Sequence, residues 1–430
     1  MNKKKVINAW CMYDWANSVY SLTITTAIFP IYYESVTREA FGSDLVNFLW
    51  WKLPNTVLYS YSLSASFLVV AMILPLLTGI ADYGGRKKMF LKIFATLGSI
   101  SCIMLFFFEG PNIEFGITCA VLASIGYSGS LVFYDAFLPE IVSKDRYDLV
   151  SARGYSFGYI GSVILLIANL LMIQMPELFG IPPGLTAAKI SFVMVGLWWI
   201  GFAQIPFRLL PDQERNKIDR SILLNGYREI RKVWFSLKDS PVLKKYLTSF
   251  FFYTMGVQTV MYLAPLYGTR VLQLTSDKLI ITVLLIQIIA IPGSYGFAKL
   301  SEIKGNKFSL MVMLFIWIGV CYFAYTVTEE TEFYILAAVV GLIMGGIQAL
   351  SRATYSKLIP QNTIDTASYF SFFDITYNVG IVCGTFAYGL IEHLTGSMRN
   401  STIALAAFFI LGIVFLSMVR TPLLNPKNSE

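Results

Sequence analysis

Residues 57–88 read VLYSYSLSASFLVVAMILPLLTGIADYGGRKK, an apolar run that ends at Ala81 and is followed by an acid, two glycines and three bases. An α-helix needs about 20 residues to cross a hydrocarbon core about 30 Å thick, so the run is long enough to span a membrane. Because Lys and Arg are in excess in cytoplasmic loops, the three bases mark the cytoplasmic end. The stretch predicts a transmembrane helix that ends inside the cell.

The rest of the chain repeats this pattern. Hydrophobic residues make up 56% of the 430 residues and charged residues 14%, with a mean hydropathy of +0.62, whereas a soluble domain is about a quarter charged. Apolar stretches of spanning length lie at Ile7–Tyr33, Val57–Ala81, Met89–Phe108, Phe115–Leu138, Tyr155–Met175, Ile190–Leu210, Tyr246–Leu266, Leu279–Leu300, Phe308–Val327, Phe333–Ile359, Tyr369–Ile391 and Thr402–Val419. The first stretch is too long for a signal-peptide core and is expected to be retained. We predict an all-α integral membrane protein with about twelve transmembrane helices.

A polar segment divides these stretches into six and six. It runs from Arg208 to Lys245 and predicts an N-terminal six-helix bundle at residues 1–210, a cytoplasmic central loop at 211–245 and a C-terminal six-helix bundle at 246–430. The Lys and Arg residues of the loop could contact anionic lipid headgroups. A solvated linker with a short amphipathic helix, such as Leu223–Leu237, is the favoured interpretation.

The distribution of basic residues sets the topology. With an even number of spans, one side of the membrane collects all the Lys and Arg residues except Arg38, Lys52, Lys189, Arg270, Lys278 and Arg399. This side is therefore cytoplasmic and carries both termini, in a multi-pass protein of the cell (inner) membrane. The topology explains the net charge of +7, so no nucleic-acid partner is inferred.

Several kinds of chemistry have no support in the sequence. The five cysteines stand singly, and His393 is the one histidine, so no ligand set for zinc or haem is expected. No phosphate-binding loop of the Gly-x-x-x-x-Gly-Lys-Ser/Thr type occurs, which argues against ATP as the direct energy source. We expect no cofactor and no metal.

A short motif recurs in the two halves, with Asp82 matched by Glu302 at an offset of 220 residues. The motif residues are Asp82, Gly85, Arg86 and Lys87 in the first copy and Glu302, Gly305 and Lys307 in the second. Two six-helix repeats around a midplane site are a construction used for alternating access. Asp82 could cap a helix N-terminus or pair with the bases, forming a cytoplasmic latch. The alternative is a simple positively charged turn.

The first copy resembles the signature loop between the second and third helices of the major facilitator superfamily. A narrower resemblance rests on four segments, Tyr13–Ser18, Ala27–Tyr32, Ala136–Ile141 and Gly345–Arg352. They resemble the family that includes the autophagy-related vacuolar amino-acid effluxers and bacterial relatives called "unknown major facilitator". The resemblance implies export or exchange of a solute, with amino acids as one class. The lysine usual in the eleventh helix of that family is missing from residues 371–378.

Polar residues at spacings of three and four on apolar helices indicate the solute path, since polar groups facing lipid are costly. The first, fourth, seventh and tenth spans supply them, and in the resembled fold these repeat-equivalent helices line the central path. The predicted path comprises Asp14, Asn17, Ser18, Ser21, Ser128, Gln258, Tyr262, Gln348 and Arg352.

Two of these residues have alternative interpretations. Asp14 is either a solvated helix start or a buried gate or proton site. Arg352 either reaches the inner headgroups along its aliphatic stem, which is favoured slightly, or binds a substrate carboxylate. Because burial disfavours the charged form of a carboxylate, Asp14, Asp374 and Asp135 are the residues that could carry a coupled proton, and Asp135 is also expected to be a cytoplasmic gate.

The sequence therefore predicts a monomeric secondary transporter or facilitator for a small polar solute, driven by the solute's own gradient or by protons. One rival is a receptor of the same fold that senses a solute without turnover. An intramembrane enzyme is less favoured, because no nucleophile with a base and no metal cluster is visible.

Overall fold

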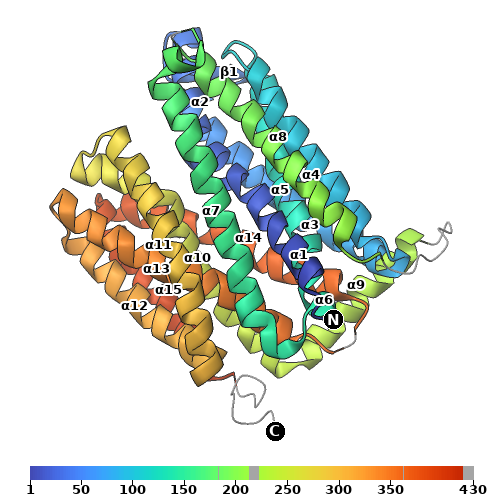
Figure 1. Ribbon diagram of the computed structural model, residues 1–430. Helices are drawn as coiled ribbons and strands as arrows, with labels where there is room; N and C mark the ends of the chain where they lie inside the picture. The colour runs from blue at the N-terminus through green and yellow to red at the C-terminus, as the bar shows by residue number, and fades with distance from the viewer. Residues whose placement is uncertain (183, 213–221, 362, 420–430) are drawn as a thin grey trace.

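The computed structural model describes residues 1–182, 184–212, 222–361 and 363–419. Arg420 and Lys427, which we assigned to the cytoplasmic side, and residues 213–221 of the central loop lie outside the described residues. The described chain forms long helices in two groups that lie side by side, one blue to green and the other yellow to red (Figure 1).

The first group holds the N-terminal half of the chain. Its elements are α1 (Lys4–Val19), the π-helix η1 (Tyr20–Ala27), α2 (Phe29–Phe41), β1 (Leu45–Phe48), β2 (Trp51–Pro54), α3 (Asn55–Gly84), α4 (Lys87–Met104), η2 (Leu105–Phe107), α5 (Ile113–Asp135), α6 (Leu138–Ile141), η3 (Lys144–Arg146), α7 (Tyr147–Gln174), η4 (Pro176–Phe179) and α8 (Thr186–Leu209). The short antiparallel hairpin β1–β2 is an addition to the predicted all-α architecture and lies between the first and second spans.

The second group follows the helix α9 (Ile222–Asp239). Its elements are α10 (Pro241–Leu272), α11 (Ser276–Lys304), α12 (Asn306–Thr326), α13 (Glu330–Leu358), α14 (Thr366–Thr395) and α15 (Met398–Ser417). Within this group α11 and α13 pack almost backbone to backbone. A Cβ on Gly345 would lie 2.2 Å from the carbonyl oxygen of Ala290, so a residue without a side chain is required there.

Ten helices of the described chain are long and apolar enough to cross a membrane. They coincide with all the predicted spans except the first and the seventh. The seventh is the continuous helix α10, and the first is divided among α1, η1 and α2. Each predicted span is thus helical, but the first one contains the π-helix η1, which the sequence did not predict.

The middle of the first span is a π-helix of eight residues, Tyr20–Ala27. Pro30 lies in the first turn of α2, where its missing N–H costs little. The polar side chains Ser21, Thr25 and Thr26 therefore belong to a stretch with an irregular hydrogen-bond pattern, of the kind that is frequent at functional sites.

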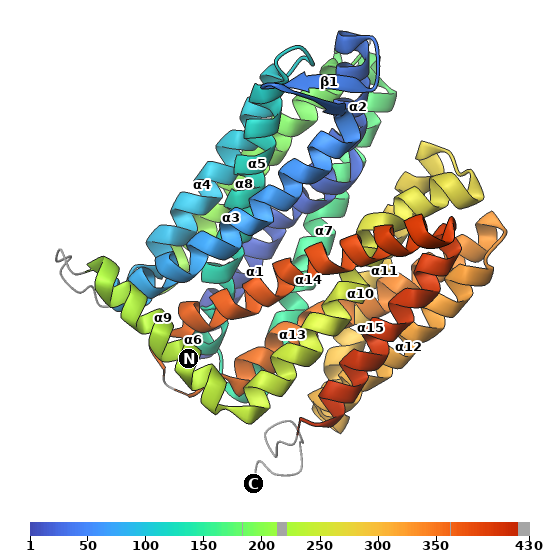
Figure 2. The ribbon, with the colours of Figure 1, turned by 180° about the vertical axis from the view of Figure 1, so that it is seen from behind.

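The helix α9 confirms the amphipathic segment expected around Leu223–Leu237. It is more than a solvated linker, because it packs against α3 and α14, and Val233 and Leu237 are buried. Lys232 pairs with Asp365 at 2.7 Å. Figure 2 shows α9 running beneath the ends of both groups of helices.

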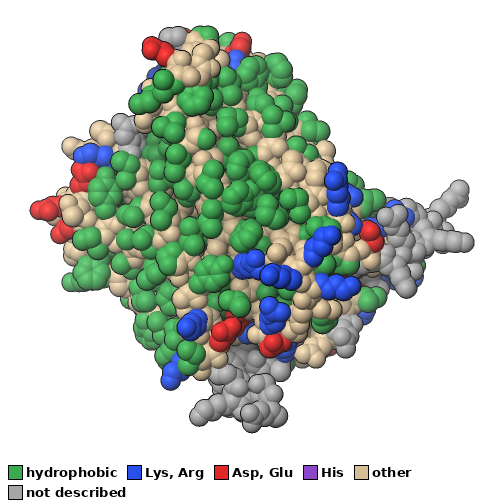
Figure 3. Space-filling model, viewed as in Figure 1, with side chains coloured by type: hydrophobic (Ala, Val, Ile, Leu, Met, Phe, Trp, Pro, Cys, Tyr) green, Lys and Arg blue, Asp and Glu red, His purple; other side chains and the backbone are tan. Residues whose placement is uncertain are grey.

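The surface has the polarity expected of a membrane protein. Figure 3 shows hydrophobic side chains over the middle of one face, while Lys and Arg side chains gather toward the end where the N-terminus lies. This agrees with the sequence argument that the N-terminal end is cytoplasmic, although the orientation and the domain boundaries at 210 and 245 stay predictions.

Candidate functional site

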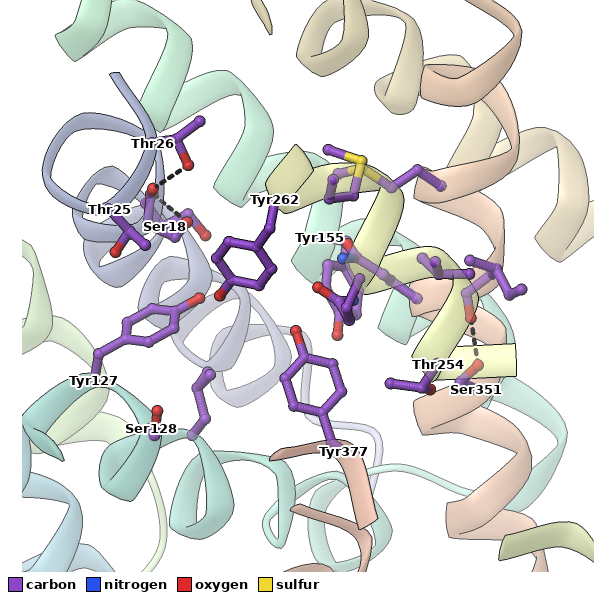
Figure 4. A pocket seen from close by; sticks show the side chains of 18 of the residues that line it. Ser18, Thr25, Thr26, Tyr127, Ser128, Tyr155, Thr254, Tyr262, Ser351 and Tyr377 are labelled. Carbon is purple, nitrogen blue, oxygen red and sulfur yellow. Dashed lines mark hydrogen bonds between the residues drawn. The ribbon is translucent and has the colours of Figure 1, made fainter. Parts of the chain in front are cut away.

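A polar cavity lies between the two groups of helices. Its volume is about 250 Å³, and its lining comes from α1, η1, α3, α5 and α7 on one side and from α10, α11, α13 and α14 on the other. Figure 4 shows hydroxyl-bearing side chains entering it from both groups, among them Ser18 and Tyr127 from one and Tyr262 and Tyr377 from the other. The cavity therefore lies at the interface between the two halves, where transporters built from two repeats bind their solutes.

Most of the predicted path residues line this cavity. They are Asp14, Ser18, Ser21, Ser128, Gln258, Tyr262, Gln348 and Arg352, together with the two further acids Asp135 and Asp374. Asn17 is different, because it is buried and does not line the cavity. The spacing of polar residues had placed Asn17 on the face of the path. Successive residues of an α-helix point in different directions, however, so Ser18 can line the cavity while Asn17 does not.

Arg352 closes one end of the cavity. Its side chain is buried and reaches from α13 into the other half of the protein, where it lies 2.9 Å from Asp135 and 3.3 Å from Asp14. The rings of Trp10 and Tyr155 lie 4.7 and 4.2 Å from the guanidinium carbon. The interpretation that Arg352 reaches the headgroups is wrong, because two carboxylates of the opposite half already compensate its charge inside the protein.

Asp14 is likewise buried, with 4% of its surface exposed, and α1 begins ten residues before it at Lys4. The solvated helix start is therefore the wrong alternative. Tyr134 donates a hydrogen bond to its Oδ2 at 2.8 Å. Space for this carboxylate depends on Gly154 of α7, where a Cβ would lie 2.5 Å from Oδ2.

A second contact between the halves involves Asp82. Its carboxylate accepts hydrogen bonds from the backbone N–H groups of Ala367 and Ser368, at 3.2 and 2.7 Å, in the first turn of α14. Lys87 lies 3.3 Å from Asp82 and also pairs with Glu140. Asp82, in the last turn of α3, thus caps a helix of the other half and pairs with Lys87, the first residue of α4.

The other residues of the predicted latch have different surroundings. Gly85 has a φ of +61°, a left-handed conformation that glycine adopts without strain. Arg86 precedes α4 at its N-cap position. In the second copy Glu302 is exposed, Gly305 has a φ of +90°, and Lys307 donates to the carbonyl oxygens of Ser417 and Val419.

A third contact between the halves lies at the second copy of the motif. Asp148, at the start of α7, accepts hydrogen bonds from Ser301 at 2.9 Å and Asn306 at 2.8 Å. Lys357 pairs with the same carboxylate at 2.7 Å. Each copy of the motif is therefore joined to the start of a helix of the other half. In the first copy Asp82 makes this contact, whereas in the second copy Ser301 and Asn306 make it in place of Glu302.

Sequence reasoning missed several residues of these contacts. Glu140, Asp148 and Lys357 lie near helix ends, where charged side chains are ordinary, and their pairing depends on residues far along the chain. Of the tyrosines that line the cavity in the described chain, sequence reasoning predicted Tyr262 but missed Tyr20, Tyr127, Tyr155, Tyr159, Tyr253 and Tyr377. Among the described residues, no group of three His, Cys, Asp or Glu side chains is placed to hold a metal ion.

Comparison with known protein families and sequences gives a consistent result. The family model described as "Vacuole effluxer Atg22 like" matches residues 2–422. An uncharacterized transporter of the major facilitator type, YxiO of Bacillus subtilis, is 34% identical over 414 residues, which cover 96% of this chain and 94% of that protein. Autophagy-related protein 22 of Kluyveromyces lactis is 24% identical over 465 residues, covering 95% and 92%.

Solved structures resemble the fold at low sequence identity. The Escherichia coli fucose:proton symporter matches with a TM-score of 0.69 at 13% identity, covering 97% of this chain and 98% of that one. A bacterial homologue of the iron transporter ferroportin in an outward-facing state matches with a TM-score of 0.65 at 12% identity, covering 96% and 98%. These likenesses support an arrangement of two six-helix bundles.

Proposed function

The chain belongs to the vacuole effluxer Atg22-like family of major facilitator transporters, and from this premise we propose that it moves a small polar solute across the cell membrane by alternating access. The observation that carries the proposal is the polar cavity between the halves, closed at one end by buried contacts between them. The family is one of transporters rather than enzymes.

The closed end is the one at which the N-terminus lies. Arg352 with Asp14, Asp82 with the start of α14, and Asp148 with Lys357 all join the halves there. Toward the other end the cavity is lined by residues near the starts of α11 and α13, such as Leu279 and Phe333. With both termini in the cytoplasm, as the basic residues predict, we propose that this conformation is the one open to the outside.

Opening to the cytoplasm would require these contacts to separate. Removing one partner of a buried ion pair costs about 3–5 kcal/mol, so an isolated guanidinium or carboxylate would resist the change. Protonation of Asp14 or Asp135 removes the charge that Arg352 compensates and lowers this cost. We propose that protonation at these two acids couples a proton gradient to the opening, with Asp374 as a further acid on the path.

The resemblance to vacuolar effluxers makes amino acids, exported or exchanged, the first solute class to assay. We propose that a monomer carries out the cycle, because the cavity is formed between the two halves of one chain.

Counterflow in proteoliposomes tests the proposal. Liposomes loaded with unlabelled solute should accumulate the labelled solute transiently when the protein is present, over a panel of amino acids, peptides, sugars and amines. A receptor that senses a solute without turnover would bind a member of the panel and give no counterflow.

A further inference from the structure

The acidic side chains that line the cavity outnumber the basic ones. Among the described residues they are the three acids Asp14, Asp135 and Asp374 and one base, Arg352. With all four ionised, three negative charges and one positive charge leave the lining at a formal charge of −2. An acidic cavity favours a cationic solute, because walls of low dielectric constant strengthen the attraction.

Arg352 has no N–H group left for a solute. A guanidinium carries five N–H donors, and the structure gives this one five hydrogen bonds. Nε donates to Ser151 Oγ, Nη1 donates to Asp135 and Asp14, and Nη2 donates to Asp14 and to the carbonyl oxygen of Ser151. A substrate carboxylate could bind Arg352 only by displacing one of these partners.

Asp374 is the acid on the path without such compensation. Asn378, one turn later on α14, donates a hydrogen bond to its Oδ2 at 2.7 Å. Within the described part of the chain, no Lys or Arg side chain forms an ion pair with Asp374, and its Oδ1 accepts no hydrogen bond. Asp374 therefore offers the cavity a carboxylate oxygen and, when it is ionised, a negative charge that no ion-pair partner in the described chain compensates.

The surroundings of Asp374 suit an ammonium group. Tyr377 lies three residues further along α14, and Figure 4 shows its hydroxyl directed into the cavity, as are those of Tyr127 and Tyr262. A tyrosine hydroxyl accepts a hydrogen bond from an N–H group, and a tyrosine ring attracts a cation to its face. Phe370 and Phe373 of the same helix provide apolar surface for the remainder of a ligand.

We propose that the cavity binds a small organic amine, a solute with a protonated amino group and no carboxylate, and that Asp374 binds the ammonium. The inference rests on the proposed function, because it names the solute class of the same site. It departs from the amino-acid class suggested by the effluxers, since an amino acid would bring a carboxylate into a cavity where Arg352 has all its donors engaged.

The test compares amines with the amino acids that differ from them by one carboxylate. Binding of tyramine and tyrosine, and of agmatine and arginine, would be measured by calorimetry on the purified full-length protein. At least one amine should bind at least about tenfold more tightly than its amino acid, because the carboxylate loses its hydration without gaining a partner. Equal or tighter binding of both amino acids, or no binding of either amine, would overturn the inference.

Two variants test the role of Asp374. Asp374→Asn keeps the size of the side chain but removes the charge, so the affinity for the amine should fall by about tenfold or more, since hydrogen bonds to charged groups are the stronger ones. Asp145→Asn removes an exposed acid outside the cavity and should leave the affinity unchanged. Unchanged amine affinity in Asp374→Asn, with loss of proton-driven uptake, would make Asp374 a proton site and refute its assignment to the amine.

Counterflow with the same four compounds separates this inference from the proposed function. An amine that binds through Asp374 but is not exchanged contradicts transport and leaves the assigned ligand class in place. An amino acid that is exchanged, while neither amine binds, contradicts the ligand class and leaves transport in place.

Discussion

Asp82 and Ser368, separated by 286 positions in the chain, are joined by two hydrogen bonds across the two halves of the protein. The backbone N–H and the hydroxyl of Ser368 both donate to Asp82 Oδ2 at 2.7 Å. Because Ser368 lies in the first turn of α14, the carboxylate also lies at the positive end of that helix dipole. An acid in the last turn of α3 therefore caps a helix of the other half.

The first prediction concerns this cap. Asp82→Asn removes the negative charge and should weaken each remaining hydrogen bond, since bonds to charged groups contribute about 1.5–3 kcal/mol. Counterflow should fall by about tenfold, while the amount of protein in the membrane stays the same. The matched control is Glu302→Gln, because Glu302 is the equivalent acid of the second motif and is exposed. Equal loss in both variants would contradict a specific role for the cap.

The second prediction concerns energy coupling. Asp14→Asn leaves Arg352 with one carboxylate, Asp135, and removes an acid that could carry the proton. Accumulation driven by an imposed pH gradient should be lost, while counterflow without a gradient persists, since exchange needs no net proton movement. Both activities would be measured in the same proteoliposomes. Loss of both would make Asp14 a structural or binding residue, and no change in either would remove it from the mechanism.

The third prediction concerns access to the cavity. In a background without the five native cysteines, cysteine at Ser21, Ser128, Gln258 or Gln348 should react with a small hydrophilic thiol reagent added from outside, because all four positions line the cavity. Cysteine at Asn17 should be protected, because this residue is buried and does not line the cavity. Labelling would be read by mass spectrometry. Protection of all four cavity positions would contradict the assigned path.

The fourth prediction concerns the closed end. Ser156 of α7 and Ser294 of α11 belong to different halves, and their hydroxyl oxygens lie 2.7 Å apart. A cysteine pair at these positions should form a disulfide on oxidation. Because the hydroxyl oxygens already lie so close, only a small shift would bring two sulfur atoms to a separation of about 2.05 Å. The oxidised double variant should lose counterflow and regain it with a reductant, whereas neither single variant should respond. Full exchange by the cross-linked protein would show that the halves need not separate there.

Local patterns in the sequence were sufficient for the spans and for α9. The length of an apolar run depends on neighbours in the chain, so Val57–Ala81 and Leu223–Leu237 could be assigned without the structure. The π-helix Tyr20–Ala27 could not be predicted, because its hydrophobic pattern differs little from that of an α-helix.

The contacts of the site depend on distant residues and were harder to predict. The acid of the Asp82 loop could be picked out, but its partner Ser368 carries no signal of its own. For Arg352 the two alternatives could be separated only when Asp14 and Asp135 were seen on neighbouring helices, because a long basic side chain can either reach the headgroups or be buried against carboxylates.

The five hydrogen bonds of Arg352 are expected to form and break together, so the closed end should have no partly open state. A small separation of the halves cannot release one bond and keep the others, because Asp14, Asp135 and Ser151 all belong to the opposite half and move away together. Each intermediate position would leave a buried charge without its partners, at a cost of several kcal/mol against a thermal energy of about 0.6 kcal/mol. Distances across this end, measured molecule by molecule, should therefore fall into two discrete populations, and a ligand should change their proportions rather than their positions.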